Sequence, residues 1–394
     1  MKRIAPALEA VLARLDAAEL RRARTTVESY PAAQRRTLTV AGGRELLDFS
    51  SNDYLGLAHH PALTAAMSAC AARCGAGSGA SHLITGHGAE HARLEEELAA
   101  FTGRERALLF STGYMANLAV MTALAGDGER VLLDRLCHAS LIDGARLSGA
   151  RLRRYGHADA DSAARLLAAD PAHTALVATD GVFSMDGDLA PLPALARAAR
   201  AADAWLVVDD AHGLGVVGPS GGGVLEHFAL DGEAVPVLIG TLGKAFGSFG
   251  AFVAGAADLI ELLLQKARTY IYTTALPQPV AAATRAALVL ARTERWRRER
   301  LHALTARFRA AALAAGVPLG ASATPIQPIP LGRPARALAA QRELAAAGFW
   351  VVAIRPPSVP PGSARLRVTL SAAHTEDEVD ALVEHLARAC RRNL

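Results

Sequence analysis

From about residue 60 to 290, short apolar runs alternate with longer stretches in which apolar residues recur every three or four positions. The short runs are too short for helices and rich in strand formers, so they predict strands, and the longer stretches predict helices. This alternation favours an α/β fold, with a mostly parallel sheet and helices on both faces. The predicted strands are Arg106–Phe110, Val131–Leu133, Ala175–Thr179, Trp205–Val208, Val237–Ile239 and Ala251–Val253, and the helices between them include Leu94–Phe101, Ala116–Leu124 and Leu192–Ala202.

The two ends of the chain have patterns of their own. The N-terminal segment predicts an amphipathic helix and a short strand pair, and the C-terminal part predicts a long helix and a second, smaller α/β domain. We therefore divide the sequence into an N-terminal segment (1–55), a large domain (56–285) and a small C-terminal domain (286–394). The elements predicted in the outer segments are strands at Thr37–Val40 and Leu46–Phe49, a helix over about Val280–Ala314, and strands near Ile326–Leu331, Trp350–Ile354 and Leu366–Leu370.

Composition narrows the class of protein. The 394 residues are 51% hydrophobic and 20% charged, which is enough to bury a sizeable core. The net charge of +4 is mild and basic clusters are mixed with acids, so we expect no nucleic-acid binding. We also expect no membrane span, because the sequence has no apolar run of 18 residues, and no signal peptide, because the N-terminus lacks an apolar core. Four cysteines without a disulfide framework favour a reducing compartment, and hence a cytoplasmic enzyme.

Lysine is nearly absent from the chain, since only three of the 42 basic residues are lysines: Lys2, Lys244 and Lys266. Lys244 lies in an apolar, glycine-rich stretch, Gly240–Gly247, that contains no other charge. A lysine with a lowered pKa can form a Schiff base, whereas an arginine keeps its proton and cannot. The alternative is an ordinary solvated lysine, and Lys2 fits it. Lys244 does not, because its neighbours form neither a charged face nor a helix stripe, so we expect it to have a covalent role.

Two acids and a histidine, Asp209, Asp210 and His212, follow the predicted strand Trp205–Val208. Ligands of open α/β sheets bind at the carboxyl ends of strands, so these side chains are candidates for a site. The alternative is structural, because Asp often ends a strand only by favouring a turn. Lys244 follows the next apolar run, and together they match the needs of pyridoxal phosphate: a lysine for the aldehyde and a carboxylate for the ring nitrogen. The sequence therefore predicts a pyridoxal-phosphate site.

Three further segments are candidates for the same site. Gly113 and Tyr114 follow a predicted strand and open a helix, whose free N–H groups could bind a phosphate. His138 follows another strand, where its ring could stack on a planar cofactor or serve a structural role. Ser184 lies in an acidic, glycine-rich segment that matches neither an EF-hand nor a nucleophile elbow, and it is interpreted as a hydrogen-bonding hydroxyl.

Two other patterns predict no site. His87 and His91 form the sequence His-x-x-Glu-His, which also occurs in a class of zinc enzymes. It lies at a helix start beside glycines and has no evident third ligand, so we predict no metal. The glycines of Gly75–Gly79 follow a helical pattern instead of a strand and so fail the test for a dinucleotide-binding loop.

Taken together, several motifs resemble the α-oxoamine synthases, a family of fold-type I pyridoxal-phosphate enzymes, essentially from end to end. The lysine motif and the Asp-x-x-His motif are specific for this family. The resemblance implies a transferase with a mostly parallel central sheet, helices on both faces, a smaller C-terminal α/β domain and a homodimeric assembly. The segments that carry it are Phe49–Leu57, Gly181–Asp188, Val208–Gly213, Thr241–Gly247, Ile354–Pro360 and Arg365–Arg367.

The resemblance also implies a role for each candidate residue. Lys244 would hold the cofactor through its amine and later move the proton of the substrate Cα. Asp209 would pair with the ring nitrogen, and His212 and Ser184 would bond the phenolic oxygen. His138 would stack on the ring and orient the acyl substrate. Gly113, Tyr114 and Thr241 would bind the phosphate, together with Thr273 or Thr274 of a second subunit. The amino-acid carboxylate would be bound by Asn52 and Arg367, and the acyl thioester by Arg21 and Ser358.

The segment around Arg355, an Arg-Pro-Pro sequence, favours a family member that condenses L-alanine with a pimeloyl thioester in biotin biosynthesis. The acyl carrier could be coenzyme A or an acyl carrier protein. Reactions of glycine with acetyl or succinyl thioesters, and a fold-type I aminotransferase, remain alternatives, while a regulatory module lacks room for a DNA-binding domain. The chain departs from the family pattern at three places. The family usually has Thr at the position of Ser358, often has Arg where His82 or Leu83 stands, and commonly has Glu at the position of Asp180. These departures leave the preferred acyl chain open.

Overall fold

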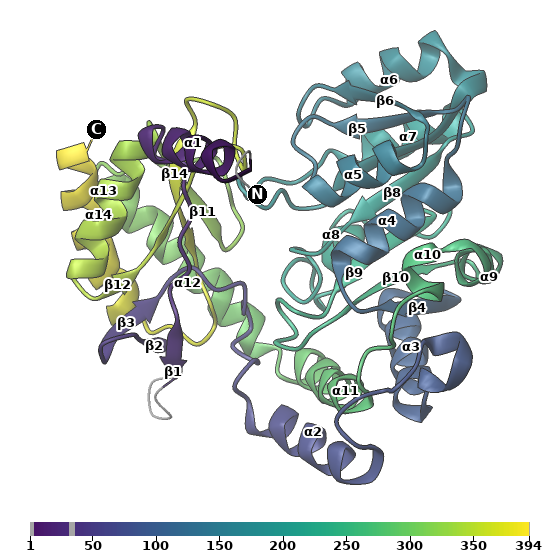
Figure 1. Cartoon of the computed structure of the whole chain (residues 1–394), viewed down its shortest axis with the longest axis horizontal. Helices are drawn as coiled ribbons and strands as arrows, with labels where there is room; N and C mark the ends of the chain where they lie inside the picture. Colours follow the sequence, from purple (N-terminus) through teal and green to yellow (C-terminus); the bar gives the residue numbers. More distant parts are fainter. Residues whose placement is uncertain (1–3, 31–35, 394) are drawn as a thin grey trace. The chain divides into compact units, whose positions relative to one another are not determined.

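The computed structural model describes residues 4–30 and 36–393, which form two compact units (Figure 1). The larger unit comprises residues 52–184 and 188–299, and the smaller unit comprises the chain up to 51, residues 185–187 and the chain from 300 onward. All four cysteines are free thiols in this structure. Among the described residues, no helix combines the length and the apolar character needed to cross a membrane.

A seven-stranded sheet forms the centre of the larger unit. Its strands are β4 (Arg106–Phe110), β5 (Arg130–Asp134), β6 (Arg151–Tyr155), β7 (Thr174–Asp180), β8 (Trp205–Asp209), β9 (Val237–Thr241) and β10 (Ala251–Gly255). They lie in the order β4-β10-β9-β8-β7-β5-β6, and all neighbours are parallel except that β10 runs antiparallel to β4 and β9. Every residue of β5 and β10 is buried, as in sheets covered on both faces. The predicted mostly parallel sheet is confirmed.

Helices follow most strands of this sheet and contribute to its core (Figure 1). Two of them, α4 (Gly113–Leu124) and α5 (Ala139–Leu147), approach each other closely at Gly144. A Cβ at Gly144 would lie 2.8 Å from the Cβ of Met121, so a larger residue would push the helices apart. The other helices of this unit are α2 (Pro61–Cys74), η1 (His82–Gly86), α3 (Ala89–Thr102), α6 (Ala160–Ala169), η2 (Pro171–His173), α7 (Leu192–Ala201), α8 (Gly223–His227), α9 (Ala257–Lys266), α10 (Arg268–Ile271) and α11 (Gln278–Thr293).

The strand β6 was not predicted from the sequence. It lies at one edge of the sheet, and its five residues include three arginines, with mostly exposed side chains. Charged residues on an edge strand discourage pairing with other chains. They also remove the apolar run by which the buried strands were recognised.

The single long helix predicted over about Val280–Ala314 is wrong. The structure has two helices there, α11 and α12 (Trp296–Ala314). Glu294 lies between them in a non-helical conformation, with φ of −95° and ψ of 61°. Its carboxylate accepts a hydrogen bond from Nε of Arg297 at 2.6 Å, in the first turn of α12. Neither Gly nor Pro marks this break in the sequence.

The smaller unit contains two sheets. The first has the order β1-β2-β3-β12 and the second the order β11-β14-β13. Its elements are α1 (Ile4–Ala17), β1 (Val27–Ser29), β2 (Thr37–Val40), β3 (Arg44–Asp48), β11 (Ile326–Gly332), α13 (Pro334–Ala346), β12 (Phe349–Trp350), β13 (Val352–Ile354), β14 (Ala364–Thr369) and α14 (Glu376–Asn393), together with most of α12.

The first of these sheets joins the two ends of the sequence. Strand β12 pairs in parallel with β3, with Phe349 opposite Leu47. The predicted strand Trp350–Ile354 divides at Val351, because its two parts, β12 and β13, belong to different sheets. Apart from residues 185–187, the chain passes from one unit to the other after residues 51 and 299. The boundaries predicted from the sequence lie after residues 55 and 285.

Candidate active site

A cavity of about 210 Å³ lies in the larger unit, where three neighbouring strands end. Asp180, Asp209 and Thr241 are the last residues of β7, β8 and β9, and all three line it. This is the edge at which open α/β sheets bind their ligands. The lining consists of Gly113, Tyr114, Asn117, His138, Asp180, Val182, Ser184, Asp209, Ala211, His212, Thr241 and Lys244. It includes the eight residues predicted to contact the cofactor from the same subunit, whereas Thr273 and Thr274, predicted to reach in from a second subunit, are not among them.

Lys244 lies on a tight turn that follows β9. The turn passes close to the neighbouring backbone at Gly247, which has a φ of +60°. A Cβ at this position would lie 2.3 Å from the backbone nitrogen of Ala58, so glycine allows both the conformation and the close approach. Of the other lysines, Lys266 is exposed on α9, and Lys2 lies outside the described residues. Lys244 is therefore the lysine that this cavity offers to a ligand.

His212 lies between Lys244 and a buried tyrosine. Its Nε2 is 2.9 Å from Nζ of Lys244, and its Nδ1 is 2.7 Å from the hydroxyl oxygen of Tyr54. The Tyr54 hydroxyl donates in turn to Oδ1 of Asn52 at 3.2 Å. These contacts form a continuous hydrogen-bonded chain from Asn52 to Lys244, which restrains the amine at the cavity.

The two neighbouring acids, Asp209 and Asp210, have different surroundings. Asp209 lines the cavity, and its two oxygens accept hydrogen bonds from Nδ2 of Asn117 at 2.7 Å and from the backbone N–H of Ala211 at 3.0 Å. Asp210 is fully buried outside the lining and accepts from the backbone N–H of Val224 at 2.9 Å. Burial raises the pKa of Asp210 well above its usual range. Asp209 is therefore the member of the pair that can face a ligand.

The sequence analysis missed two polar residues at this site, Asn117 and Ser140. Nδ2 of Asn117 donates to Oγ of Ser140 at 2.7 Å, and the same Oγ lies 2.7 Å from Nδ1 of His138. Asn117 lies one turn after Gly113 in a largely apolar helix, and this polar residue on the same helix face could have indicated a place at the site. Ser140 gave no such signal, because it reaches Asn117 only through the packing of α5 against α4.

A third acid, Asp180, also lines the cavity. Burial, followed by the negative charge of Asp209, raises the pKa of Asp180 well above its usual range. Its Oδ1 accepts a hydrogen bond from the backbone N–H of His138 at 3.1 Å. Desolvation lowers the pKa of the His138 imidazole, so this ring is neutral near pH 7.

The start of α4 lies at the cavity, with Gly113 and Tyr114 on its lining. The side chain of Thr112 caps the helix by accepting from the backbone N–H of Met115 at 3.2 Å. A Cβ at Gly113 would meet no atom within 4 Å, so this glycine leaves open space beside the first N–H groups of the helix. Tyr114 is 42% exposed and donates its hydroxyl proton to Asp143.

These features fit pyridoxal phosphate. The open helix start at Gly113 suits a phosphate, and Thr241, whose hydroxyl donates to a backbone carbonyl at 3.1 Å, lies on the same lining. Lys244 offers an amine for the aldehyde, and Asp209 offers a carboxylate for the ring nitrogen. The three chemical needs of the cofactor are thus met within one cavity.

Of the five residues predicted to bind substrate, His138 lines this cavity and the other four lie outside its lining. Arg21 and Ser358 line a separate hollow of about 600 Å³ within the smaller unit, where Ser358 accepts a hydrogen bond from Arg22 at 3.3 Å. Asn52 belongs to the larger unit and accepts from Tyr54, as described above. Arg367 is buried on β14. Their substrate-binding roles remain predictions.

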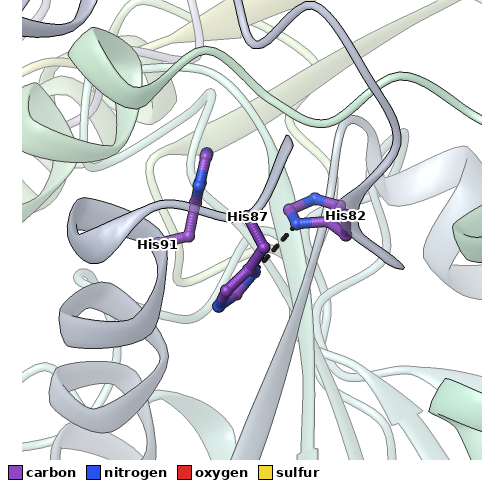
Figure 2. A group of neighbouring side chains, drawn as sticks. All are labelled: His82, His87 and His91. Atoms are coloured by element: carbon purple, nitrogen blue, oxygen red, sulfur yellow. Dashed lines mark hydrogen bonds between the residues drawn. The ribbon is translucent and has the colours of Figure 1, made fainter. Parts of the chain in front are cut away.

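His82, His87 and His91 form a cluster in the larger unit (Figure 2), with one ring nitrogen of each within 4.8 Å of the others, so His82 is a third histidine that was not evident from the sequence. Nδ1 of His91 accepts from the backbone N–H of Gly88 at 2.9 Å, and its Nε2 lies 2.5 Å from the carbonyl oxygen of Leu276. Nδ1 of His82 lies 3.0 Å from Nδ1 of His87. Because both nitrogens of His91 are engaged, the cluster does not present three available lone pairs to an ion, and we assign no metal to it.

Comparison with known proteins identifies the family. The family model for aminotransferase class I and II matches residues 44–386. Among curated relatives named 8-amino-7-oxononanoate synthase, that of Methylococcus capsulatus is 60% identical over 378 residues, which cover 96% of this chain and 97% of the relative. That of Pseudomonas putida is 58% identical over 380 residues, covering 96% of each chain.

Solved structures agree with this result. A structure of SPT with PLP has a TM-score of 0.89 at 31% identity and covers 94% of this chain and 92% of its own. An 8-amino-7-oxononanoate synthase from Francisella tularensis has a TM-score of 0.78 at 31% identity and covers 88% of this chain and 98% of its own. The fold is that of fold-type I transferases and the cofactor is pyridoxal phosphate. The chain belongs to the 8-amino-7-oxononanoate synthase family of pyridoxal-phosphate-dependent acyltransferases.

Proposed function

We propose that this protein condenses L-alanine with a pimeloyl thioester, forming 8-amino-7-oxononanoate and releasing CO2 and the free thiol, as a step of biotin biosynthesis. The names of the relatives supply the reaction. The observation that carries the proposal is the cavity that contains the Lys244 amine, the Asp209 carboxylate and the open helix start at Gly113. These are the groups that a pyridoxal-phosphate enzyme needs for chemistry at an amino-acid Cα.

Each residue of the cavity has a role in the proposal. When bound, pyridoxal phosphate supplies an electron sink for the bonding pair at the substrate Cα. Lys244 would hold the aldehyde and, once displaced by the substrate amine, would remove the Cα proton with Nζ. His212, whose Nε2 is 2.9 Å from Nζ, would orient that amine and, with Ser184, bond the phenolic oxygen. Asp209 would hold a proton at the ring nitrogen.

The remaining assignments concern binding. His138 would stack on the cofactor ring and orient the acyl substrate, and its neutral form suits contact with an uncharged carbonyl. The phosphate would be bound by Gly113, Tyr114 and Thr241. Following the family resemblance, we assign the amino-acid carboxylate to Asn52 and Arg367, and the acyl thioester to Arg21 and Ser358.

The assembly and the acyl carrier are part of the same proposal. We expect a cytoplasmic homodimer in which Thr273 or Thr274 of one subunit reaches the phosphate bound by the other, as the family resemblance implies. The acyl carrier is coenzyme A or an acyl carrier protein, and the two can be compared directly as thioester substrates.

Thiol release tests the function. We expect L-alanine with a pimeloyl thioester to give the fastest release among combinations of alanine, glycine or serine with acetyl, succinyl or pimeloyl thioesters. One methyl group in a pocket is worth about 1–3 kcal/mol, so the preference for alanine over glycine should be about 10–200-fold. Faster release from glycine with an acetyl thioester, or from glycine with a succinyl thioester, would replace the biotin reaction by another reaction of the α-oxoamine synthases. Reactions without amino acid provide the blank.

A further inference from the structure

A series of hydrogen bonds inside the larger unit connects two cavity residues that are far apart in the sequence, Asp209 and His138. Nδ2 of Asn117 donates both to Oδ2 of Asp209 and to Oγ of Ser140, each at 2.7 Å. Oγ of Ser140 in turn lies 2.7 Å from Nδ1 of His138. The series therefore runs from the carboxylate at the end of β8, through α4 and α5, to the imidazole at the start of α5.

The directions of these hydrogen bonds follow from the donors available. Both amide protons of Asn117 are used, one toward Asp209 and one toward Ser140. Nδ1 of His138 accepts from the backbone N–H of Ser140 and so cannot donate, which makes the buried Ser140 hydroxyl, 2.7 Å away, the donor to it. The backbone N–H of Ser140 also points to Nδ1, at 3.4 Å. With two donors directed at it, Nδ1 carries a lone pair, and the proton of the neutral ring is on Nε2.

The helix packing maintains this arrangement. Gly144 lets α5 approach α4 so closely that a Cβ there would lie 3.3 Å from the backbone oxygen of Asn117. Oδ1 of Asn117 is buried without a hydrogen-bond partner among the described residues. A buried acceptor left unpaired is unfavourable for folding, so stability alone does not account for an asparagine at this position.

We propose that Asn117 and Ser140 are positioning residues that keep His138 in the tautomer protonated at Nε2 and direct that N–H to the carbonyl oxygen of the acyl substrate. This inference rests on the proposed function, because it assumes the acyl-transfer reaction. Negative charge grows on the carbonyl oxygen as the substrate Cα forms its bond to the acyl carbon, and a fixed donor is most effective where charge develops. In the other tautomer, Nε2 would carry a lone pair and repel that oxygen.

The same asparagine holds the carboxylate that would face the ring nitrogen. Asn117 therefore couples the two sides of the reaction, whereas Ser140 acts on His138 alone. Removing the Ser140 hydroxyl should affect the use of the thioester and leave the binding of cofactor and L-alanine nearly unchanged. This split distinguishes a positioning role from a general structural role.

The tautomer can be measured directly by NMR of protein labelled with ¹⁵N-histidine, without cofactor or substrate. The His138→Gln variant identifies the signals of His138 among the 13 histidines. We expect one tautomer, protonated at Nε2, near neutral pH in the wild-type protein. In Ser140→Ala we expect a mixture of tautomers. Ser148→Ala is the matched control, because Ser148 lies at the other end of α5 and donates to the carbonyl of Ala145 at 2.8 Å.

Kinetics provide the second readout. Ser140→Ala should lower kcat/KM for the pimeloyl thioester by roughly 2- to 13-fold, the worth of one neutral hydrogen bond. The KM for L-alanine should stay within about twofold, because His138 does not contact this substrate in the proposal, and Ser140→Thr should restore part of the loss by returning a hydroxyl.

A wild-type ring protonated at Nδ1, or a tautomer unchanged in a folded Ser140→Ala protein, would overturn the inference. The wild-type measurement alone decides the matter if the variant fails to fold. Failure of the proposed function would look different: L-alanine with the pimeloyl thioester would not be the fastest pair for the wild-type protein, while the tautomer of His138 would still be as inferred.

Discussion

Replacing Lys244 by alanine should lower kcat by at least about 10²–10⁴-fold, the usual contribution of a positioned acid–base group. The expected loss is at the upper end or beyond, because the same amine would also bind the cofactor covalently. The visible absorption of lysine-bound cofactor should disappear, although pyridoxal phosphate can still bind through its phosphate and ring. Absorption spectra and thiol-release rates of the purified variant measure both effects.

Lys266→Ala is the matched control. Lys266 is exposed on α9 and lies outside the cavity lining, so its replacement should change neither the spectrum nor the rate. A Lys244→Ala protein that keeps covalently bound cofactor would mean that Lys266 or Lys2 carries it, and the assignment of Lys244 would fail.

The change Asp209→Asn should leave the fold intact and lower kcat by about 10²–10³-fold, the magnitude typical for loss of one preorganised electrostatic contact. A neutral amide has the shape of the carboxylate but cannot stabilise a proton on the ring nitrogen. Steady-state rates with saturating pyridoxal phosphate, together with thermal unfolding curves, separate loss of chemistry from loss of cofactor or of structure.

The neighbouring acid provides the comparison. Asp210 lies outside the cavity lining, and burial raises its pKa well above its usual range, which favours its neutral form. Asp210→Asn should therefore lower kcat much less than Asp209→Asn does. Equal damage from the two substitutions, or greater damage at Asp210, would exchange the roles of the pair.

Much of the large unit could be predicted because its strands are buried on both faces and hence continuously apolar. The runs at Arg106–Phe110 and Trp205–Val208 differ from β4 and β8 by at most one residue. Where a strand or a break lies among charged residues, the pattern was not informative. The edge strand β6 is rich in arginine, and the break at Glu294 lies beside a contact with Arg297.

The site could be predicted to the extent that its residues stand out in the sequence. Lys244 does so in a chain that otherwise uses arginine, and Asp209 and His212 do so at the end of an apolar strand. Asn117 and Ser140 do not, because their contact exists only through the close packing of α4 against α5. Parts of the site that depend on helix packing therefore required the structure.

Reduction with borohydride followed by peptide mass mapping tests the central claim most directly. Borohydride converts a cofactor–lysine linkage into a stable secondary amine, so the modified lysine can be found in the peptide map. The account predicts the pyridoxyl group on the peptide that contains Lys244, and its loss when L-alanine is added in excess before reduction. A pyridoxyl group on Lys266 or Lys2, or none on any lysine of a catalytically active protein, would contradict it.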